Sequence, residues 1–155
     1  MTRVSHQGRF RVPAAEMYAF HRDVRNLARV SPPFPRVRVE GGGKPAEPGD
    51  EQRVTLHGGL FRVRTRARIT RLVPPADTNP GYMEDTLVEG PFRYWRHQHQ
   101  VFPVAEGCIL RDVVEFELFP SRVGKLLDAV IAKPAFKLMF RYRHWRTGRL
   151  LRVKR

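Results

Sequence analysis

The chain has 155 residues, with 29 Lys and Arg against 15 Asp and Glu, so its net charge is +14 when the histidines are neutral. This length suits one domain with a single core, and the charge favours acidic partners such as an anionic membrane or a nucleic acid. Cys108 is the single cysteine, which excludes an internal disulfide and a cysteine-based zinc site. No segment reaches the roughly 20 apolar residues that span a bilayer. We therefore expect a cytoplasmic protein whose membrane contact, if any, is peripheral to the inner face.

The first part of the sequence predicts a strand followed by two helices. Alternate residues form a less polar face between Val4 and Val12, which predicts a strand there. Pro13 has the fixed φ that suits a first helical turn, and apolar residues about one turn apart continue to residue 21. Asp23 is the expected N-cap of a second short helix, Val24 to Val30, which ends at Ser-Pro-Pro.

From residue 36 onward the hydrophobic period changes to about two residues, which indicates a sheet. We expect strands at 36–40, 52–57, 60–73, 82–89, 92–102 and 108–119, separated by segments rich in Gly and Pro. In strand 60–73 an apolar face alternates with a basic ladder of Arg62, Arg64, Arg66 and Arg68. In strand 108–119 one acid, Asp112, interrupts an apolar face. Gly41-Gly42-Gly43 lacks the Lys-Ser/Thr of a phosphate-binding loop and is read as a plain turn.

The C-terminal part predicts a long helix with an apolar side and a basic end. Ser121 is the expected N-cap, the helix continues to about Arg149, and Pro134 should kink it. Its predicted apolar side comprises Leu126, Leu127, Val130, Ile131, Phe136, Met139 and Phe140. After Asp128 the chain has no acid, and the basic segment at about 141–155 could lie on anionic lipid. RNA is less favoured because no RNA-binding motif accompanies the charge.

These elements predict an α+β fold of one domain, residues 1–155, without internal repeats. Six to seven antiparallel strands must twist and curl, so the long C-terminal helix would lie across the concave side of the sheet. Where the helix and the sheet do not meet fully, a cavity would remain.

Several short phrases, spread over nearly the whole chain, have the spacing of one known family. They are Phe10-x-Val12-Pro13-Ala14, Phe20-His21-x-Asp23-x-Arg25-Asn26-Leu27, Ser31-Pro32-Pro33, Glu84-Asp85 before Gly90-Pro91-Phe92, Trp95-x-His97-x-His99, and Asp112. With these phrases the chain resembles the START/polyketide-cyclase (SRPBCC) superfamily, in particular its cyclase/dehydrase-like bacterial proteins of unassigned role. The resemblance implies a helix-grip fold with a deep pocket for lipids, polyketides or other apolar molecules, mostly without a cofactor. Such a fold does not by itself establish an activity.

Polar residues within the predicted strands are the candidates for chemistry. Trp95, His97 and His99 share one strand face. Two histidines are too few for a zinc site, so we expect no metal. Asp85 and Asp112 lie mid-strand, where acids are disfavoured, and each should pair with a histidine or an arginine of a neighbouring strand.

We therefore expect the protein to bind or transport a hydrophobic small molecule, without a cofactor, and we favour a binding protein over an enzyme. The predicted pocket wall comprises Phe61, Val63, Trp95, His97, His99, Leu110, Asp112, Val114, Phe116, Val130, Met139 and Phe140. One alternative is a polyketide cyclase or dehydratase in which Asp112 works with His97 or His99 as acid and base. A second alternative is a peripheral membrane or RNA-binding module that uses the basic segment 141–155.

Overall fold

The computed structural model describes residues 1–118 and 121–152. The strands are β1 (Thr2–Phe10), β2 (Arg36–Glu40), β3 (Glu51–Gly58), β4 (Phe61–Val73), β5 (Gly81–Glu89), β6 (Tyr94–Val104) and β7 (Gly107–Glu117). The helical elements are α1 (Ala14–Arg22), α2 (Arg25–Val30), α3 (Arg122–Leu127), the π-helical turn η1 (Asp128–Ala132) and α4 (Lys133–Arg152). None of the described helices is long and apolar enough to cross a membrane.

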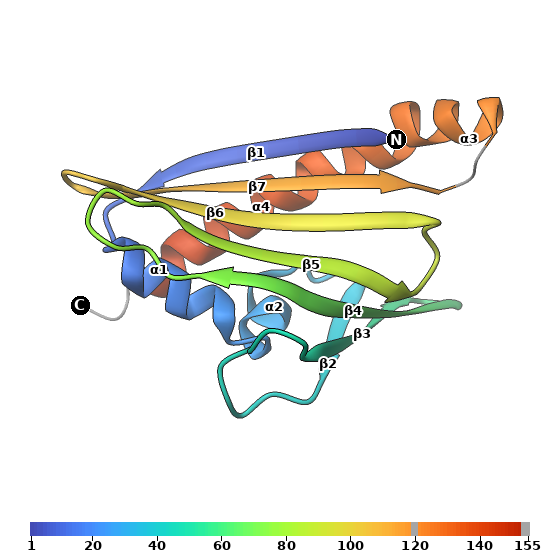
Figure 1. The fold of residues 1–155 in the computed structure, drawn as a ribbon. Coiled ribbons are helices and arrows are strands. Elements are labelled where there is room, and N and C mark those ends of the chain that lie inside the picture. Colours follow the sequence, from blue (N-terminus) through green and yellow to red (C-terminus); the bar gives the residue numbers. More distant parts are fainter. Residues whose placement is uncertain (119–120, 153–155) are drawn as a thin grey trace.

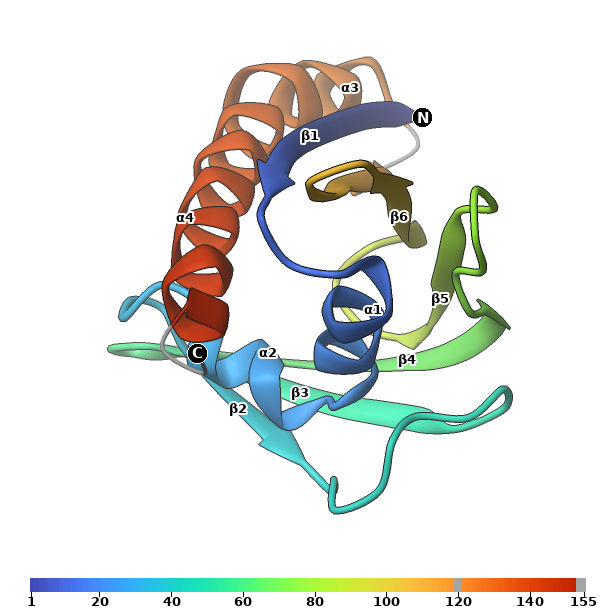
Figure 2. The same ribbon diagram turned by 90° about the vertical axis from the view of Figure 1, so that its left-hand side faces the viewer.

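All seven strands belong to one sheet in the order β1-β7-β6-β5-β4-β3-β2, and every neighbouring pair is antiparallel. The sheet curls strongly, α4 runs along its open side, and α1 and α2 fill one end (Figures 1 and 2). A sheet of this length twists, and a helix laid across the concave face buries the apolar sides of both. The predicted α+β arrangement, a curved sheet around a long C-terminal helix, is confirmed.

Strand β4 makes the bend in the sheet, and its apolar face differs from the prediction at one residue, Phe61. Its pairing with β5 shifts register between Arg66 and Ala67 and again between Ile69 and Arg71, and such irregularities bend a strand. Ile69 is buried, but Phe61 at the other end is 51% exposed. The ring of Phe61 packs across the β3–β4 hairpin over the bare Cα of Gly58 instead of entering the core.

The basic ladder on the other face of β4 is partly neutralised by neighbouring acids, as expected for cross-strand pairs. Arg68 Nη2 lies 2.7 Å from Glu51 Oε1, and Arg66 contacts both Glu51 (3.4 Å) and Glu89 (3.3 Å). These pairs are exposed and each contributes little to stability. They reduce the positive charge of this face without removing it.

The core has two apolar clusters. One joins α1 and the end of α4 to the sheet through Phe10, Met17, Phe20, Leu110 and Leu151 with their neighbours. The other joins the middle of α4 to β1 and β7 through Val4, Val114, Phe116 and Phe140. On β7 the predicted inward residues Cys108, Leu110, Val114 and Phe116 are buried with Asp112 among them, whereas Leu118, predicted on the same face, lies just beyond the strand and is only partly buried. Because side chains alternate between the two faces of a strand, Asp112 lies on the same inward face as these apolar residues.

The C-terminal helix begins as predicted, because the Ser121 hydroxyl accepts a hydrogen bond from the Gly124 N–H at 2.9 Å. The distortion near Pro134 is a π-helical turn, η1, which ends at Ala132, two residues before the proline. Proline has no N–H to donate, and a wider turn accommodates the missing helical bond.

The first part of this helix contradicts the predicted apolar side. Leu126, Val130 and Ile131 are each more than 60% exposed and Leu127 is 37% exposed. Figure 1 shows the reason, since α3 projects beyond the end of the sheet, where the concave face no longer lies opposite it. Only Phe136, Met139 and Phe140 of the predicted set reach the interior.

Two boundary changes concern the ends of α2 and β7, while β1 and β6 are displaced by two residues from the predicted strands 4–12 and 92–102. The N-cap of α2 is Val24, and the Asp23 carboxylate instead accepts from the Arg25 backbone N–H at 3.0 Å and from its guanidinium group. Strand β7 ends at Glu117, and Phe119, predicted as its last residue, lies outside the described residues. Neither change moves a residue of the interior.

Candidate functional site

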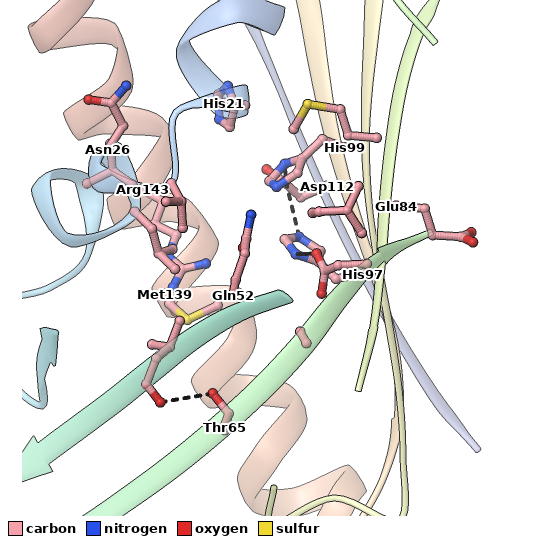
Figure 3. A pocket seen from close by; sticks show the side chains of 18 of the residues that line it. His21, Asn26, Gln52, Thr65, Glu84, His97, His99, Asp112, Met139 and Arg143 are labelled. Carbon is pink, nitrogen blue, oxygen red and sulfur yellow. Dashed lines mark hydrogen bonds and ion pairs between the residues drawn. The ribbon is translucent and has the colours of Figure 1, made fainter. Parts of the chain in front are cut away.

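A cavity of about 250 Å³ lies between the concave face of the sheet, the α1–α2 pair and α4. It is mainly apolar at one end, where Leu56, Leu87, Phe92, Trp95 and Phe136 line it. Polar side chains gather toward its centre from several elements, as Figure 3 shows. This volume lies just below the usual range for pockets that hold drug-sized ligands, so a ligand held here would be small.

Five of the twelve predicted wall residues line the cavity. They are Trp95, His97, His99, Asp112 and Met139. Four more, Leu110, Val114, Phe116 and Phe140, are buried in the two apolar clusters, because the helices pack directly on that part of the sheet. Phe61 and Val63 lie on β4 away from the lining, and Val130 is 63% exposed on the projecting turn η1. These seven residues were predicted to line the cavity, and the structure places them outside its wall.

Several lining residues were missed because the prediction of the wall did not include the helix pair or the basic half of α4. The α1–α2 pair supplies Phe20, His21, Asn26, Leu27 and Val30, and β3 supplies Gln52, Val54 and Leu56. From α4 come Arg143, His144 and Thr147. Helical spacing contained a usable signal, because His144 follows Phe140 by four residues and therefore shares its inward face.

The centre of the polar group is Asp112, which is 3% exposed. Its Oδ2 lies 2.5 Å from His144 Nε2, its Oδ1 lies 3.4 Å from His97 Nε2, and His99 Nδ1 also contacts Oδ1. His97 Nδ1 lies 3.5 Å from Asp85 Oδ2. These five residues are called the Asp112 cluster below.

Strand register creates most of the Asp112 cluster. His99 is directly opposite Asp112 across the β6–β7 pair, and Asp85 is directly opposite His97 across the β5–β6 pair. Directly opposite residues point to the same face of a sheet, so their side chains meet. The expected pairing of both mid-strand acids with histidines is thus present, and Trp95 Nε1 also donates to Asp85 Oδ1 at 3.2 Å.

His144 joins the Asp112 cluster from α4, and Gly8 of β1 makes room for it. A Cβ atom at position 8 would lie 2.9 Å from His144 Nδ1. The ring of His144 packs edge-on against His6 at a centroid distance of 4.6 Å. A side chain at Gly8 would therefore push the imidazole away from Asp112.

Burial and charge hold the groups of the cluster in different protonation states. Burial opposes the charge of Asp112, but the adjacent imidazoles outweigh it and hold the pKa of this carboxyl well below its usual value. Burial also opposes charge on His97, yet its bonds to Asp112 and Asp85 raise its pKa to about 9. For His99 burial prevails and lowers the pKa. Two imidazoles with centroids 4.3 Å apart thus favour opposite states at neutral pH.

Across the cavity, Arg143 and His21 complete the polar lining. The pKa of His21 is lowered to about 3, first by burial and then by His99. Its Nδ1 is 2.9 Å from the Met17 carbonyl, so the neutral ring donates there. Burial lowers the pKa of Arg143 to about 10, which leaves it charged at neutral pH.

The tertiary structure also supplies a third potential metal ligand. Ligand atoms of His97, His99 and Asp112 all lie within 4.8 Å of one another. Two imidazoles and a carboxylate are a donor set that first-row transition metals accept. The prediction of no metal had rested on the lack of a third ligand close in sequence, and that reason no longer holds.

We nevertheless expect the purified protein to contain no stoichiometric metal. Protonated His97 already lies between Asp112 and Asp85 and offsets one of their two negative charges, so a cation would have to displace a proton that both carboxylates favour. The measurement is elemental analysis of protein purified without a metal column, together with the melting temperature in excess Zn²⁺. About one metal per chain, or a large rise of the melting temperature with zinc, would contradict the expectation.

Comparisons with known proteins agree with this fold. The family described as polyketide cyclase / dehydrase and lipid transport matches residues 11–141. A protein of Chromobacterium violaceum is similar in structure with a TM-score of 0.71 and 16% identity, over 96% of both chains. Norcoclaurine synthase of Thalictrum flavum, solved with a transition-state analogue, gives a TM-score of 0.68 and 15% identity over 99% of this chain and 95% of its own.

The structure of Ara h 8.0201 is also similar, with a TM-score of 0.60 and 12% identity over 95% of this chain and 98% of its own. No curated protein matches the sequence. At such low identity the structural likeness establishes the fold and leaves activity to be argued from the site.

Proposed function

The chain belongs to the polyketide cyclase/dehydrase and lipid transport family, and from this premise we propose that it binds a small hydrophobic molecule in the cavity between its sheet and its helices. The resemblance stated from the sequence is thereby confirmed at the level of the family. The observation that supports the proposal is a cavity of about 250 Å³ with an aliphatic and aromatic end and a polar centre.

The two parts of the cavity would act differently on a ligand. Its apolar end would contribute about 25 cal/mol for each Å² of ligand surface removed from water. Its polar centre would fix the orientation, because a polar ligand group left unpaired there would lose its hydration without compensation. An apolar molecule with one polar end matches this distribution better than a wholly apolar one.

Filling the cavity should abolish binding without unfolding the protein. Ala67 lines the cavity from β4, whereas Arg64 on the same strand is exposed on the other face. We expect Ala67→Trp to reduce co-purified or added ligand at least tenfold, measured by native mass spectrometry of freshly purified protein. Arg64→Trp is the matched control and should retain the ligand.

Retention of the ligand in the Ala67→Trp variant would place the ligand elsewhere and refute the proposal. Circular dichroism of both variants checks that the fold persists. A bound mass in the wild type would also give the class of the ligand directly.

A second candidate function is acid–base catalysis of an aldol-type cyclisation or dehydration. The observation that favours it is the split between protonated His97 and neutral His99 on either side of the Asp112 carboxylate, since neighbouring groups with separated pKa values can supply an acid and a base. A structural neighbour is named as a synthase, so a related fold carries catalysis in that protein. Turnover of a poly-β-keto substrate that survives the His97→Gln/His99→Gln double substitution would exclude this mechanism.

Peripheral contact with an anionic membrane is the third candidate, and its surface differs from the predicted one. Residues 141–152 belong to α4, and Thr147, Gly148 and Leu151 are buried, so part of the apolar side of this basic segment faces the protein, while Trp145 remains 50% exposed. Residues 153–155, with Lys154 and Arg155, lie outside the described residues. A second group of exposed aliphatic side chains, which includes Val123, Leu126, Val130 and Ile131, lies on α3 and η1 beside Lys125 and Lys133.

Sedimentation with anionic vesicles distinguishes the two surfaces. If α3 and η1 insert, Leu126→Glu should abolish binding, whereas Leu138→Glu, at an equally exposed site on α4, should not. If the basic segment acts alone, both variants should bind and only added salt should release the protein. A cytoplasmic location remains a prediction that rests on the single cysteine.

A further inference from the structure

Arg143 is a charged side chain that lines the cavity and has no acidic partner in contact among the residues that the structure describes. Its guanidinium makes one hydrogen bond, from Nη2 to the Ser31 hydroxyl at 3.3 Å. Its Nε is buried and has no partner among the described residues. A guanidinium has five N–H donors, so most of its donor capacity is unused in the absence of a ligand.

The acids of the cavity do not account for this charge. Asp85 and Asp112 favour the charged form of Arg143 from a distance, but neither forms an ion pair with it. Both carboxylates are held by imidazoles of the Asp112 cluster on the facing wall. A charge that is largely removed from water without a contacting partner is costly to the free protein, and a charged group perturbed in this way at a cavity wall is a candidate for ligand binding.

A second donor lies close to this position. The Gln52 side chain lines the cavity from β3 and has no hydrogen-bond partner among the described residues. Figure 3 shows its amide end pointing into the space between Arg143 and the histidines. Arg143 and Gln52 therefore offer N–H donors from two different elements to the same region.

The apolar end of the cavity begins about two turns away along α4. Phe136 and Arg143 both line the cavity and are seven residues apart, which corresponds to roughly 10 Å along a helix axis. Phe136 packs against Trp95 and Phe92 at centroid distances of 5.4 and 6.1 Å. A molecule of medium length would reach from the guanidinium to these rings.

We propose that the ligand is an amphipathic carboxylic acid whose carboxylate is bound by Arg143, with Gln52 as a second donor, while its apolar body lies against Phe92, Trp95 and Phe136. This inference rests on the proposed binding function and adds the chemical class of the ligand. Arginine suits the role because its planar fork matches the two oxygens of a carboxylate.

The test compares two probes of nearly equal size, decanoate and decanamide, by isothermal titration at neutral pH. A charge-assisted bond that only the acid can make should favour decanoate by about 10- to 100-fold. Arg143→Met should remove this preference, so that decanoate and decanamide bind the variant with affinities within about threefold of each other. Arg141→Met is the matched control, because Arg141 lies on the same helix, is exposed and does not line the cavity.

The outcomes separate this inference from the proposed function. If both probes bind the wild type equally, the cavity binds apolar molecules and Arg143 does not select an anion, which overturns the inference alone. If neither probe binds, the proposed function fails and the inference fails with it. Equal loss of preference in Arg141→Met would trace the effect to general charge and would also overturn it.

A stability measurement separates a binding role for Arg143 from a structural one. Because its charge is desolvated without a contacting acid, Arg143→Met should raise the melting temperature of the ligand-free protein by a few degrees. Added decanoate should raise the melting temperature of wild type more than that of the variant. A lower melting temperature for the ligand-free variant would show that Arg143 supports the fold, contrary to the proposal.

Discussion

Asp112→Asn is expected to lower the free energy of unfolding by about 3–5 kcal/mol, a large part of the stability of a domain this size. The carboxylate is contacted by His97, His99 and His144 from two different elements. Asparagine keeps the shape but removes the negative charge, which leaves protonated His97 with Asp85 as its remaining acid and places an amide N–H₂ against imidazole N–H groups. Breaking one side of a buried charge network costs more than the network contributes as a whole.

Urea denaturation followed by circular dichroism measures this loss. Asp77→Asn is the matched control, because Asp77 is exposed and its positive φ of 48° is one that asparagine also adopts. The control should change stability by less than about 0.5 kcal/mol. A loss below about 1 kcal/mol for Asp112→Asn would mean that the imidazoles are satisfied without the carboxylate.

Stability of the wild type should be greatest near pH 6.5 and should fall on both sides. The folded pKa of His97 is raised to about 9, because bonds to Asp112 and Asp85 outweigh its burial. Its contribution is therefore complete below the unfolded value of about 6.5 and is lost as the pH rises toward 9. A shift of this size corresponds to about 3 kcal/mol.

On the acid side of about pH 6.5 the dependence of stability on pH is reversed, so that stability falls as the pH falls. The folded pKa of His21 is lowered to about 3, mainly by burial. Between pH 6.5 and 3 the unfolded chain binds a proton at this residue that the folded protein does not, so stability falls with pH. Asp112, whose pKa is also lowered, adds to the same loss at the lowest pH values.

Denaturant titrations from pH 4 to pH 10 test both limbs. His97→Gln should flatten the alkaline limb, whereas His57→Gln, on β3 and outside the Asp112 cluster, should leave it unchanged. An alkaline limb that persists in His97→Gln would assign the transition to another group and refute the assignment to His97.

The sequence alone determined the elements and much of the fold. The period of two along 36–117 is a local property, and it correctly predicted the presence of strands β2 to β7 and the inward face of β7 with Asp112 on it. The Ser121 cap was predictable for the same reason, because it depends on residues three positions apart. The helix pair and the closing helix together with these strands indicated the family.

The cavity was predictable in outline and less so in detail. Trp95, His97 and His99 lie on one face of a strand that the curl of the sheet turns inward, so alternation sufficed to place them. Phe116 of β7 and Phe140 of α4 were also predicted to face inward, but they lie in one apolar cluster in which the helix packs directly on the sheet. Periodicity gives the direction of a side chain and does not give the thickness of the space in front of it.

Only the tertiary structure decided which polar residues meet. Asp112 and His144 are 32 positions apart in the sequence. Arg143 on α4 faces Gln52 on β3, which is still more distant in the sequence. Their approach depends on how far the sheet curls and where α4 crosses it, which are set by the packing of the whole core. The exposure of Leu126 and Val130 has the same origin, because an apolar helix face is buried only where the fold provides a surface to cover it.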